Sequence, residues 1–372
     1  MYNRTVGLVL LFAVAICFCL PTETTSETQA KKHRKEQIRP IKLGTSGGNN
    51  KDTDGFFCCS GTLGALVEDI SGSPIRQYVL SNNHVLGLGN NGKVGDDVDQ
   101  PGLIDHNCFP SNAGPVADLS RKVKFKFGLS KKNFVDAAIA QVRPGAVDPT
   151  GAILDIGLPG QPIEPALGDK VQKVGRTSGK RAGKIVVLGT TIIVPISTEC
   201  GGSVSKTARF EDQMIIQPAK ASKPFSQGGD SGSLVIQKKT GCPAAIGLLA
   251  FGDNNGFGGA NRIQTVLSKL KVKIVGCDLS AAASQKSIRP FSMQDSRVLQ
   301  AVSIKDRYVD QLIKTPGISA VGIGHAMEGS EQLAVVVFVT KGSVAATNRG
   351  SFPMQLEALP VRIVETSGFR LM

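Results

Sequence analysis

The stretch Gly228-Gly229-Asp230-Ser231-Gly232-Ser233 carries the most information about the fold of this chain. A serine that attacks a carbonyl group needs a tight loop, because the backbone N–H groups of Gly229 and Ser231 must converge on the oxygen that becomes negative during acyl transfer. Glycine lets the loop turn and leaves room for a ligand to approach. The rival serine motif G-x-S-x-G is excluded because position 233 is Ser. The loop therefore predicts an activated serine at position 231.

Two further segments supply a base and an acid for such a serine. In residues 78–85, an apolar, β-prone run gives way to small polar residues and then to His84. In residues 133–140, the lone carboxylate of Asp136 interrupts an apolar stretch, and such a group is costly to bury unless it is hydrogen-bonded. Taken singly, each residue also has a structural interpretation, as an exposed histidine, a buried turn partner or a Gly-rich loop. The remaining histidines, His33, His106 and His325, lack this sequence context.

The order His84, Asp136, Ser231 separates the families of serine hydrolases. Subtilisin-type enzymes run Asp, His, Ser, and α/β-hydrolases run Ser, acid, His. Residues 46–280 therefore resemble the chymotrypsin-like (trypsin-like) serine proteases, especially the bacterial streptogrisin and α-lytic protease branch. The resemblance implies that Ser231 attacks the scissile carbonyl, His84 transfers the proton and Asp136 orients the imidazole. It also implies an oxyanion hole formed by Gly229 and Ser231.

A fourth segment, residues 174–179, reads Val-Gly-Arg-Thr-Ser-Gly. It resembles the Gly-Arg-Thr-Thr-Gly hairpin of that bacterial branch, in which the Arg pairs with the Asp beside the nucleophile. The resemblance implies that Arg176 supports Asp230, a task that a newly cut N-terminus performs in animal zymogens. A plain β-turn with a solvated Arg176 is the alternative. No Cys follows His84, and Gln227 replaces a Cys near the nucleophile, so two disulfides of the animal enzymes are missing.

The resemblance also implies where substrate binds. Phe225 stands where trypsin has its acidic pocket floor, which predicts cleavage after apolar residues rather than after Arg or Lys. Asp253 would restore a basic preference if the loop after Gly252 folded inward. The substrate-pairing strand would contain Ala250, Phe251 and Gly252, whose backbone would bind a peptide in β-fashion.

The N-terminus predicts export. Arg4 precedes residues 6–20, an uncharged run that polar and small residues follow, which is typical of a secretory signal peptide and too short for a membrane-spanning helix. We assign residues 1–26 to this leader and residues 27–45 to a basic linker or propeptide. We expect a secreted protein, either extracellular or periplasmic. Six cysteines remain after the leader, which suits disulfides but leaves 15 pairings open.

Composition and charge narrow the class further. With 43 Gly and 19 Pro between short Val/Ile/Leu runs, the 372-residue chain favours an all-β core, here a double β-barrel. The formal charge of +13 is partly concentrated before the protease domain. That cluster would attract acidic cell-surface polymers, but it lacks the interleaved aromatic residues of nucleic-acid-binding segments. Cysteine spacing gives no metal pattern, and we expect no cofactor; the oligomeric state is open.

After Cys277 the sequence changes character. Residues 281–294 read as an Ala/Ser-rich linker, and residues 295–372 as a small α+β accessory domain. Val298, Val302 and Val309 share one face of a helix predicted for residues 295–314, which Pro316 and Gly317 would end. Three strands are predicted after it, over residues 318–324, 333–340 and 359–365. This domain could regulate the protease, bind a partner or occupy its active site.

The sequence thus predicts a secreted serine endopeptidase that acts through a His-Asp-Ser triad and an acyl-enzyme, with peptides or proteins as substrates. The competing interpretation is a catalytically silent homologue that binds peptides or cell-surface material through the same cleft.

Overall fold

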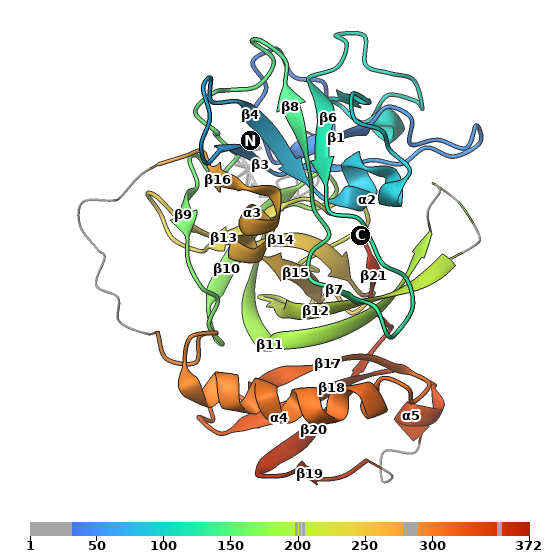
Figure 1. Ribbon diagram of the computed structural model, residues 1–372, viewed down its shortest axis with the longest axis vertical. Helices are drawn as coiled ribbons and strands as arrows, with labels where there is room; N and C mark the ends of the chain where they lie inside the picture. Colours follow the sequence, from blue (N-terminus) through green and yellow to red (C-terminus); the bar gives the residue numbers. More distant parts are fainter. Residues whose placement is uncertain (1–31, 198–199, 201, 203–204, 278–288, 348–351) are drawn as a thin grey trace, which may run out of the picture.

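A computed structural model describes residues 32–197, 200, 202, 205–277, 289–347 and 352–372. Two curled β-sheets form the body of the protein, and the strands of the C-terminal residues extend the second sheet at one end of the molecule (Figure 1). The all-β core predicted from the Gly-rich sequence is confirmed. Within the described residues, no helix has the length and apolar character needed to span a membrane.

The first sheet has eight strands in the order β16-β3-β4-β8-β6-β5-β1-β2. They are β1 (Thr45–Asn49), β2 (Gly61–Leu63), β3 (Ala65–Asp69), β4 (Gln77–Ser81), β5 (Asp97–Asp99), β6 (Ala117–Lys122), β8 (Ala138–Val142) and β16 (Val272–Ile274). Apolar residues of these strands, such as Leu66, Leu80 and Ile139, are fully buried and belong to one core cluster. The short helices α2 (Asn83–Leu86) and α3 (Ile263–Leu270) lie beside this sheet, with η1 (Leu88–Asn90) and η2 (Leu103–Asp105) in its loops.

The second sheet follows the order β19-β20-β18-β17-β11-β10-β13-β14-β15-β12-β7, with β9 and β21 added along β14. Its strands before residue 263 are β7 (Lys132–Asn133), β9 (Gly160–Pro162), β10 (Lys170–Gly175), β11 (Gly179–Ser197), β12 (Ser205–Pro218), β13 (Leu234–Gln237), β14 (Ala244–Gly252) and β15 (Gly258–Arg262). Two apolar runs, residues 185–188 and 191–194, belong to one long strand, β11. It continues through an irregular stretch at Gly189, whose φ of +54° suits glycine.

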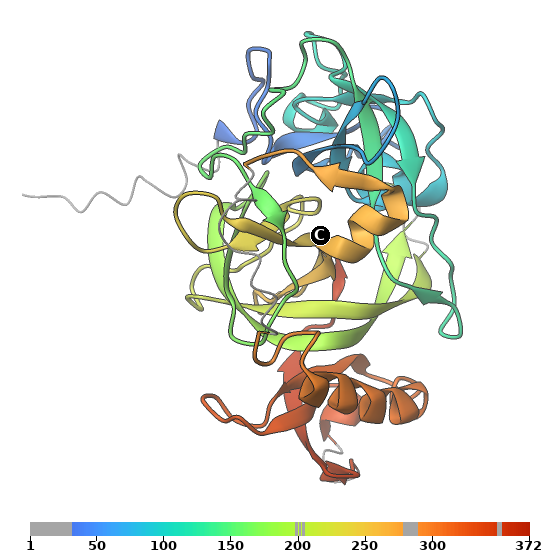
Figure 2. The same cartoon turned by 60° about the vertical axis from the view of Figure 1, so that its left-hand side comes forward.

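The C-terminal elements extend this second sheet. They are α4 (Ser296–Leu312), β17 (Ile318–His325), β18 (Leu333–Thr340), α5 (Val344–Thr347), β19 (Gln355–Leu356), β20 (Leu359–Thr366) and β21 (Arg370–Leu371). The helix and the three strands expected after Cys277 are confirmed nearly to the residue. Strand β17 pairs with β11, and Val298 of α4 belongs to the same core cluster as Ile185. The module is therefore continuous with the second barrel (Figure 2).

Both segments that we expected to be linkers are partly packed. Ile41 and Leu43 are fully buried in the first core and bridge Val147 and Ile153, so the described part of residues 27–45 belongs to the barrel. Met293, in the second expected linker, is also buried. Each packs because its apolar side chains fill a core, a tertiary effect that local composition does not reveal. The expected leader, residues 1–26, lies outside the described residues.

Three disulfides resolve the open cysteine pairing. Cys58 joins Cys108, Cys59 joins Cys200, and Cys242 joins Cys277. The second of these links the loop after β1 to the loop after β11, and so connects the two barrels. Loops joined in this way have less freedom in the unfolded chain, which favours the folded state.

The C-terminus returns to the junction between the barrels. After β20, the chain leaves the module and ends in β21, which pairs antiparallel with β14. Figure 1 shows the last residues between the two sheets, next to α2.

Candidate active site

His84 and Asp136 meet at the edge of the first barrel. Strand β4 leads into helix α2, which carries His84, and Asp136 comes two residues before β8. The His84 Nδ1 atom lies 2.5 Å from Oδ2 of Asp136. Burial disfavours a charged imidazole, but the Asp136 carboxylate outweighs this effect, and the pKa of His84 lies above its usual value. His84 is thus held in one orientation beside a carboxylate.

Asp136 is fully buried and well supported. Its Oδ1 accepts hydrogen bonds from the backbone N–H groups of Asn83, at 2.7 Å, and of His84, at 3.3 Å. Asn261 on β15 accepts a hydrogen bond from the Asp136 N–H. The sequence predicted that burying this carboxylate would be costly without hydrogen bonds. The backbone donors and His84 offset that cost.

Ser231 lies on the tight turn between β12 and β13. Gly229 and Gly232 have φ values of +92° and +91°, a region that glycine tolerates. A Cβ atom on Gly232 would also come within 2.3 Å of the carbonyl oxygen of Thr62. Thr62 on β2 fixes the loop, because its N–H donates to the Ser231 carbonyl and its hydroxyl donates to the Gly229 carbonyl. Throughout the described chain, the amides of Gly229 and Ser231 donate no hydrogen bond to a protein acceptor.

Asp230 is paired with Lys173, and the expected pairing with Arg176 is wrong. The Lys173 ammonium lies 2.7 Å from Asp230, and Arg176 instead forms a two-pronged ion pair with Asp105. Lys173 points inward from β10, whereas Arg176 begins the turn after this strand and faces Asp105 on the first barrel. Lys173 thus lies one residue before the segment expected from the sequence, residues 174–179, and performs the task assigned to Arg176.

Asp230 also accepts hydrogen bonds from the turn between β10 and β11. The N–H groups of Thr177 and Ser178 donate to Oδ1, and the Ser178 hydroxyl donates to Oδ2 at 2.6 Å. Burial disfavours the charged carboxylate, but Lys173 and these donors hold the pKa of Asp230 below its usual value. The loop that carries Ser231 thus rests on a buried carboxylate that Lys173 and the β10–β11 turn hold in place.

The last residue of the chain lies between His84 and Ser231. The Met372 N–H donates to Ser231 Oγ and to the Ala250 carbonyl oxygen, both at 3.1 Å. A main-chain oxygen of Met372 lies 3.3 Å from Nε2 of His84. The main chain of this one residue therefore contacts both side chains, and Ser231 is fully buried beneath it.

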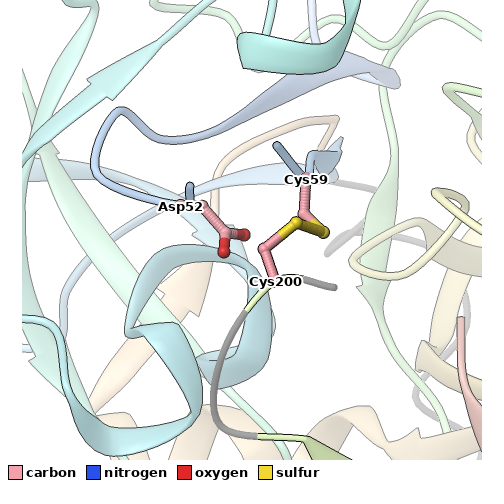
Figure 3. A group of neighbouring side chains, drawn as sticks. All are labelled: Asp52, Cys59 and Cys200. Atoms are coloured by element: carbon pink, nitrogen blue, oxygen red, sulfur yellow. A yellow bond between two sulfur atoms is a disulfide. The ribbon is translucent and has the colours of Figure 1, made fainter. Parts of the chain in front are cut away.

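A cleft of about 360 Å³ opens beside these residues, and Asp52 lines it together with His84 and Gly229. Figure 3 shows the Asp52 carboxylate next to the Cys59–Cys200 disulfide. Carboxylate and sulfur atoms gather there, but a metal ion binds thiolates, and these sulfurs are bonded to each other. Burial raises the pKa of Asp52 to about 6, while the nearby His84 opposes the rise. Asp52 therefore contributes a carboxylate that titrates near neutral pH.

The residues expected to bind substrate lie together around β14. Phe225 is fully buried in the second core and packs against Gly258 of β15. Next to it in the chain, Ser226 lies against Gly252, which also borders the Met372 side chain. Asp253 accepts a hydrogen bond from Thr366 of the C-terminal module at 2.6 Å, and this bond holds it in place.

Several residues of the site escaped the sequence analysis. Lys173 could have been suspected from the sequence, because it lies within a strand and a lysine buried there needs a buried anion as its partner. Thr62, Asn261 and Met372 had none, since each reaches the site from a distant part of the chain.

Comparison with known proteins identifies the fold. A family model described as trypsin matches residues 68–271, more than half of the chain. Protease A of Thermobifida fusca is similar in structure, with 16% identity, a TM-score of 0.41 and coverage of 64% of this chain and 99% of that one. The Nocardiopsis protease has 16% identity, a TM-score of 0.41 and coverage of 63% and 98%. A search of curated proteins finds no match. The family match and the two curled sheets confirm the chymotrypsin-like all-β fold.

Proposed function

Because the chain belongs to the trypsin family of serine proteases, we propose that it is a secreted endopeptidase in which His84, Asp136 and Ser231 hydrolyse peptide bonds. The observation that carries the proposal is the contact of 2.5 Å between His84 and Asp136, with Ser231 bridged to the same His84 by the main chain of Met372. Nucleophile, base and acid are thus within reach of one reacting group.

In this proposal the imidazole moves the proton. With Nδ1 donating to Asp136, the Nε2 atom of neutral His84 carries no proton and takes that of Ser231 Oγ as the oxygen attacks the carbonyl carbon. The imidazolium then gives this proton to the leaving amine, and an acyl-enzyme remains on Ser231. Water deacylates it by the same path in reverse. Asp136 stays ionised and stabilises the charged imidazole.

Backbone groups would hold the substrate and its transition state. The amides of Gly229 and Ser231, which no protein acceptor occupies within the described chain, are suited to a developing oxyanion. The backbone of Ala250, Phe251 and Gly252 offers an edge to which an extended peptide can add as a strand. We assign Phe225 to the wall of the specificity pocket, which favours apolar side chains.

Two further structural features support this proposal. The buried Lys173–Asp230 pair stabilises the serine loop without a newly cut N-terminus, so no activating cleavage is needed for this loop. Three disulfides suit an oxidising compartment, in agreement with a leader at residues 1–26.

Replacing Ser231 or His84 by Ala tests the proposal. Each change should abolish hydrolysis of an unfolded protein substrate and leave the circular dichroism spectrum unchanged, because the two residues act as one unit. His106→Ala serves as the matched control, since the His106 ring hydrogen-bonds the Phe109 carbonyl oxygen of its own loop. A folded wild-type protein that hydrolyses nothing, with residues 370–372 present or removed, would favour the silent, peptide-binding alternative.

A further inference from the structure

The C-terminal residues bind the edge of the second barrel as an added strand. Strand β21 runs antiparallel to β14, with Leu371 opposite Phe251 and Arg370 opposite Gly252. The Met372 N–H continues the ladder to the Ala250 carbonyl oxygen at 3.1 Å. Figure 1 shows β21 entering between the sheets, and Figure 2 shows the same end of the chain from another side. The segment thus covers the strand at which we place an extended peptide substrate.

Met372 fills the position of the residue whose bond would be cut. Its N–H reaches Ser231 Oγ and its carbonyl oxygen faces His84 Nε2. Its side chain is buried against Gly252, where an added Cβ atom would lie 2.9 Å from both Cγ and Cε of Met372. The missing side chain at position 252 leaves the space that the unbranched thioether occupies. Main chain and side chain of Met372 therefore both fit the site.

The C-terminal module fixes this segment in place from the other side. Thr366 donates to Asp253 at 2.6 Å, and the N–H of Asn254 donates to the hydroxyl of Ser367 at 2.7 Å. Phe369 is buried, and its ring meets Phe338 of β18 edge-on at 5.5 Å. The loop after β14 is thus clamped to the end of β20, and residues 370–372 leave this clamp directly into the cleft.

We propose that residues 370–372 are an intramolecular peptide ligand of the substrate groove, bound as the acyl half of a substrate, and that they inhibit the protein until they are displaced. The inhibition part of this inference rests on the proposed function, because only an active protease can be inhibited. The binding of residues 370–372 in the groove does not require catalysis. It also names the class of substrate that would compete: extended peptides with Met, or a similarly long unbranched apolar residue, at the position of Met372.

Tethering makes such a short ligand effective. A peptide held beside its site by a short connection acts at an effective concentration in the mM range. Three residues with a few backbone hydrogen bonds bind weakly when free, but at that concentration the closed form would predominate. The apparent affinity for substrate then falls in proportion to the open fraction, and an open fraction of about one tenth gives about a tenfold loss.

Removal of residues 370–372 tests the inhibition. The deletion keeps Phe369 and its packing, and we expect kcat/KM for a peptide substrate to rise about tenfold or more over the full chain. Met372→Asp, which puts a charge against Gly252, should give a similar rise if the deletion fails to fold. Met354→Asp is the matched control, because Met354 is 90% exposed in the same module, and it should leave the rate unchanged. Equal rates in all four proteins would overturn the proposal.

Binding is tested separately in the Ser231→Ala background, where no chemistry takes place. A fluorescein-labelled Gly-Phe-Arg-Leu-Met peptide should bind the deletion variant, and the full chain should bind it about tenfold more weakly. The same peptide ending in Asp is the control and should bind neither protein. Peptide binding without hydrolysis by any variant would uphold this inference and refute the proposed function. Hydrolysis at the same rate by the full and shortened chains, without binding of the peptide, would uphold the proposed function and refute this inference.

Discussion

The ammonium nitrogen of Lys173 lies 2.7 Å from the carboxylate of Asp230, and both side chains are fully buried. The pair joins β10 to the loop that carries Ser231. A buried ion pair can bring little net stability over an apolar pair, but removing one partner leaves a charge without compensation. The relationship therefore makes the serine loop depend on one lysine of a neighbouring strand.

Lys173→Met should destabilise the protein by about 3–5 kcal/mol, the cost of breaking a buried pair from one side. Urea unfolding measures this change. Lys170→Met on the same strand replaces an exposed lysine and should change the free energy of unfolding by less than about 0.5 kcal/mol. Adding Asp230→Asn to Lys173→Met should restore part of the stability, since the stranded charge is gone. Equal stability of the two lysine variants would show that Lys173 is not the partner of Asp230.

Asp136→Asn should reduce kcat by about 10⁴-fold while the fold persists, because an amide cannot stabilise the charged imidazole and favours the wrong tautomer of His84. Steady-state kinetics on the variant without residues 370–372 measure the effect free of competition from the chain itself. Asp54→Asn provides the control, since Asp54 is exposed and only caps its own turn. A loss of less than tenfold would remove Asp136 from the proposed triad.

Asp52 predicts a change in the pH profile. Its carboxylate, with a pKa near 6, raises the pKa of His84 through its charge. The reaction requires neutral His84, so activity is lost as the pH falls through the pKa of this histidine. Asp52→Asn removes the charge and lowers that pKa, and the acidic limb of kcat/KM should move to lower pH. A limb that moved to higher pH, or not at all, would contradict the electrostatic link between the two residues.

The substrate pocket predicts a preference for apolar side chains. Gly252 borders the Met372 side chain and Ser226, we place the apolar Phe225 in the pocket wall, and Asp253 is held by Thr366. A peptide library cleaved by the shortened chain should therefore show Met or another unbranched apolar residue before the cut. Arg or Lys at that position would mean that Asp253 leaves Thr366 and enters the pocket, and the assignment of the pocket would be wrong.

The sequence predicted what short segments and their order can encode. The helix over residues 295–314 followed from its apolar stripe, and the proximity of His84 to Asp136 followed from family order together with the cost of a buried carboxylate. It misassigned the partner of Asp230, because Lys173 and Arg176 share one hairpin and only the packed structure decides which cation points inward. The binding of Met372 beside Ser231 joins residues 141 positions apart, and no local pattern encodes such a contact.

The most direct test of the central claim is labelling with a fluorophosphonate, which reacts only with an activated serine. Applied to the chain without residues 370–372, the probe should modify Ser231, as identified by peptide mass mapping, and should do so faster than in the full chain. Ser231→Ala should not react. A folded, shortened chain that leaves Ser231 unmodified would contradict the account, because a serine with a working base and oxyanion hole cannot escape this reagent.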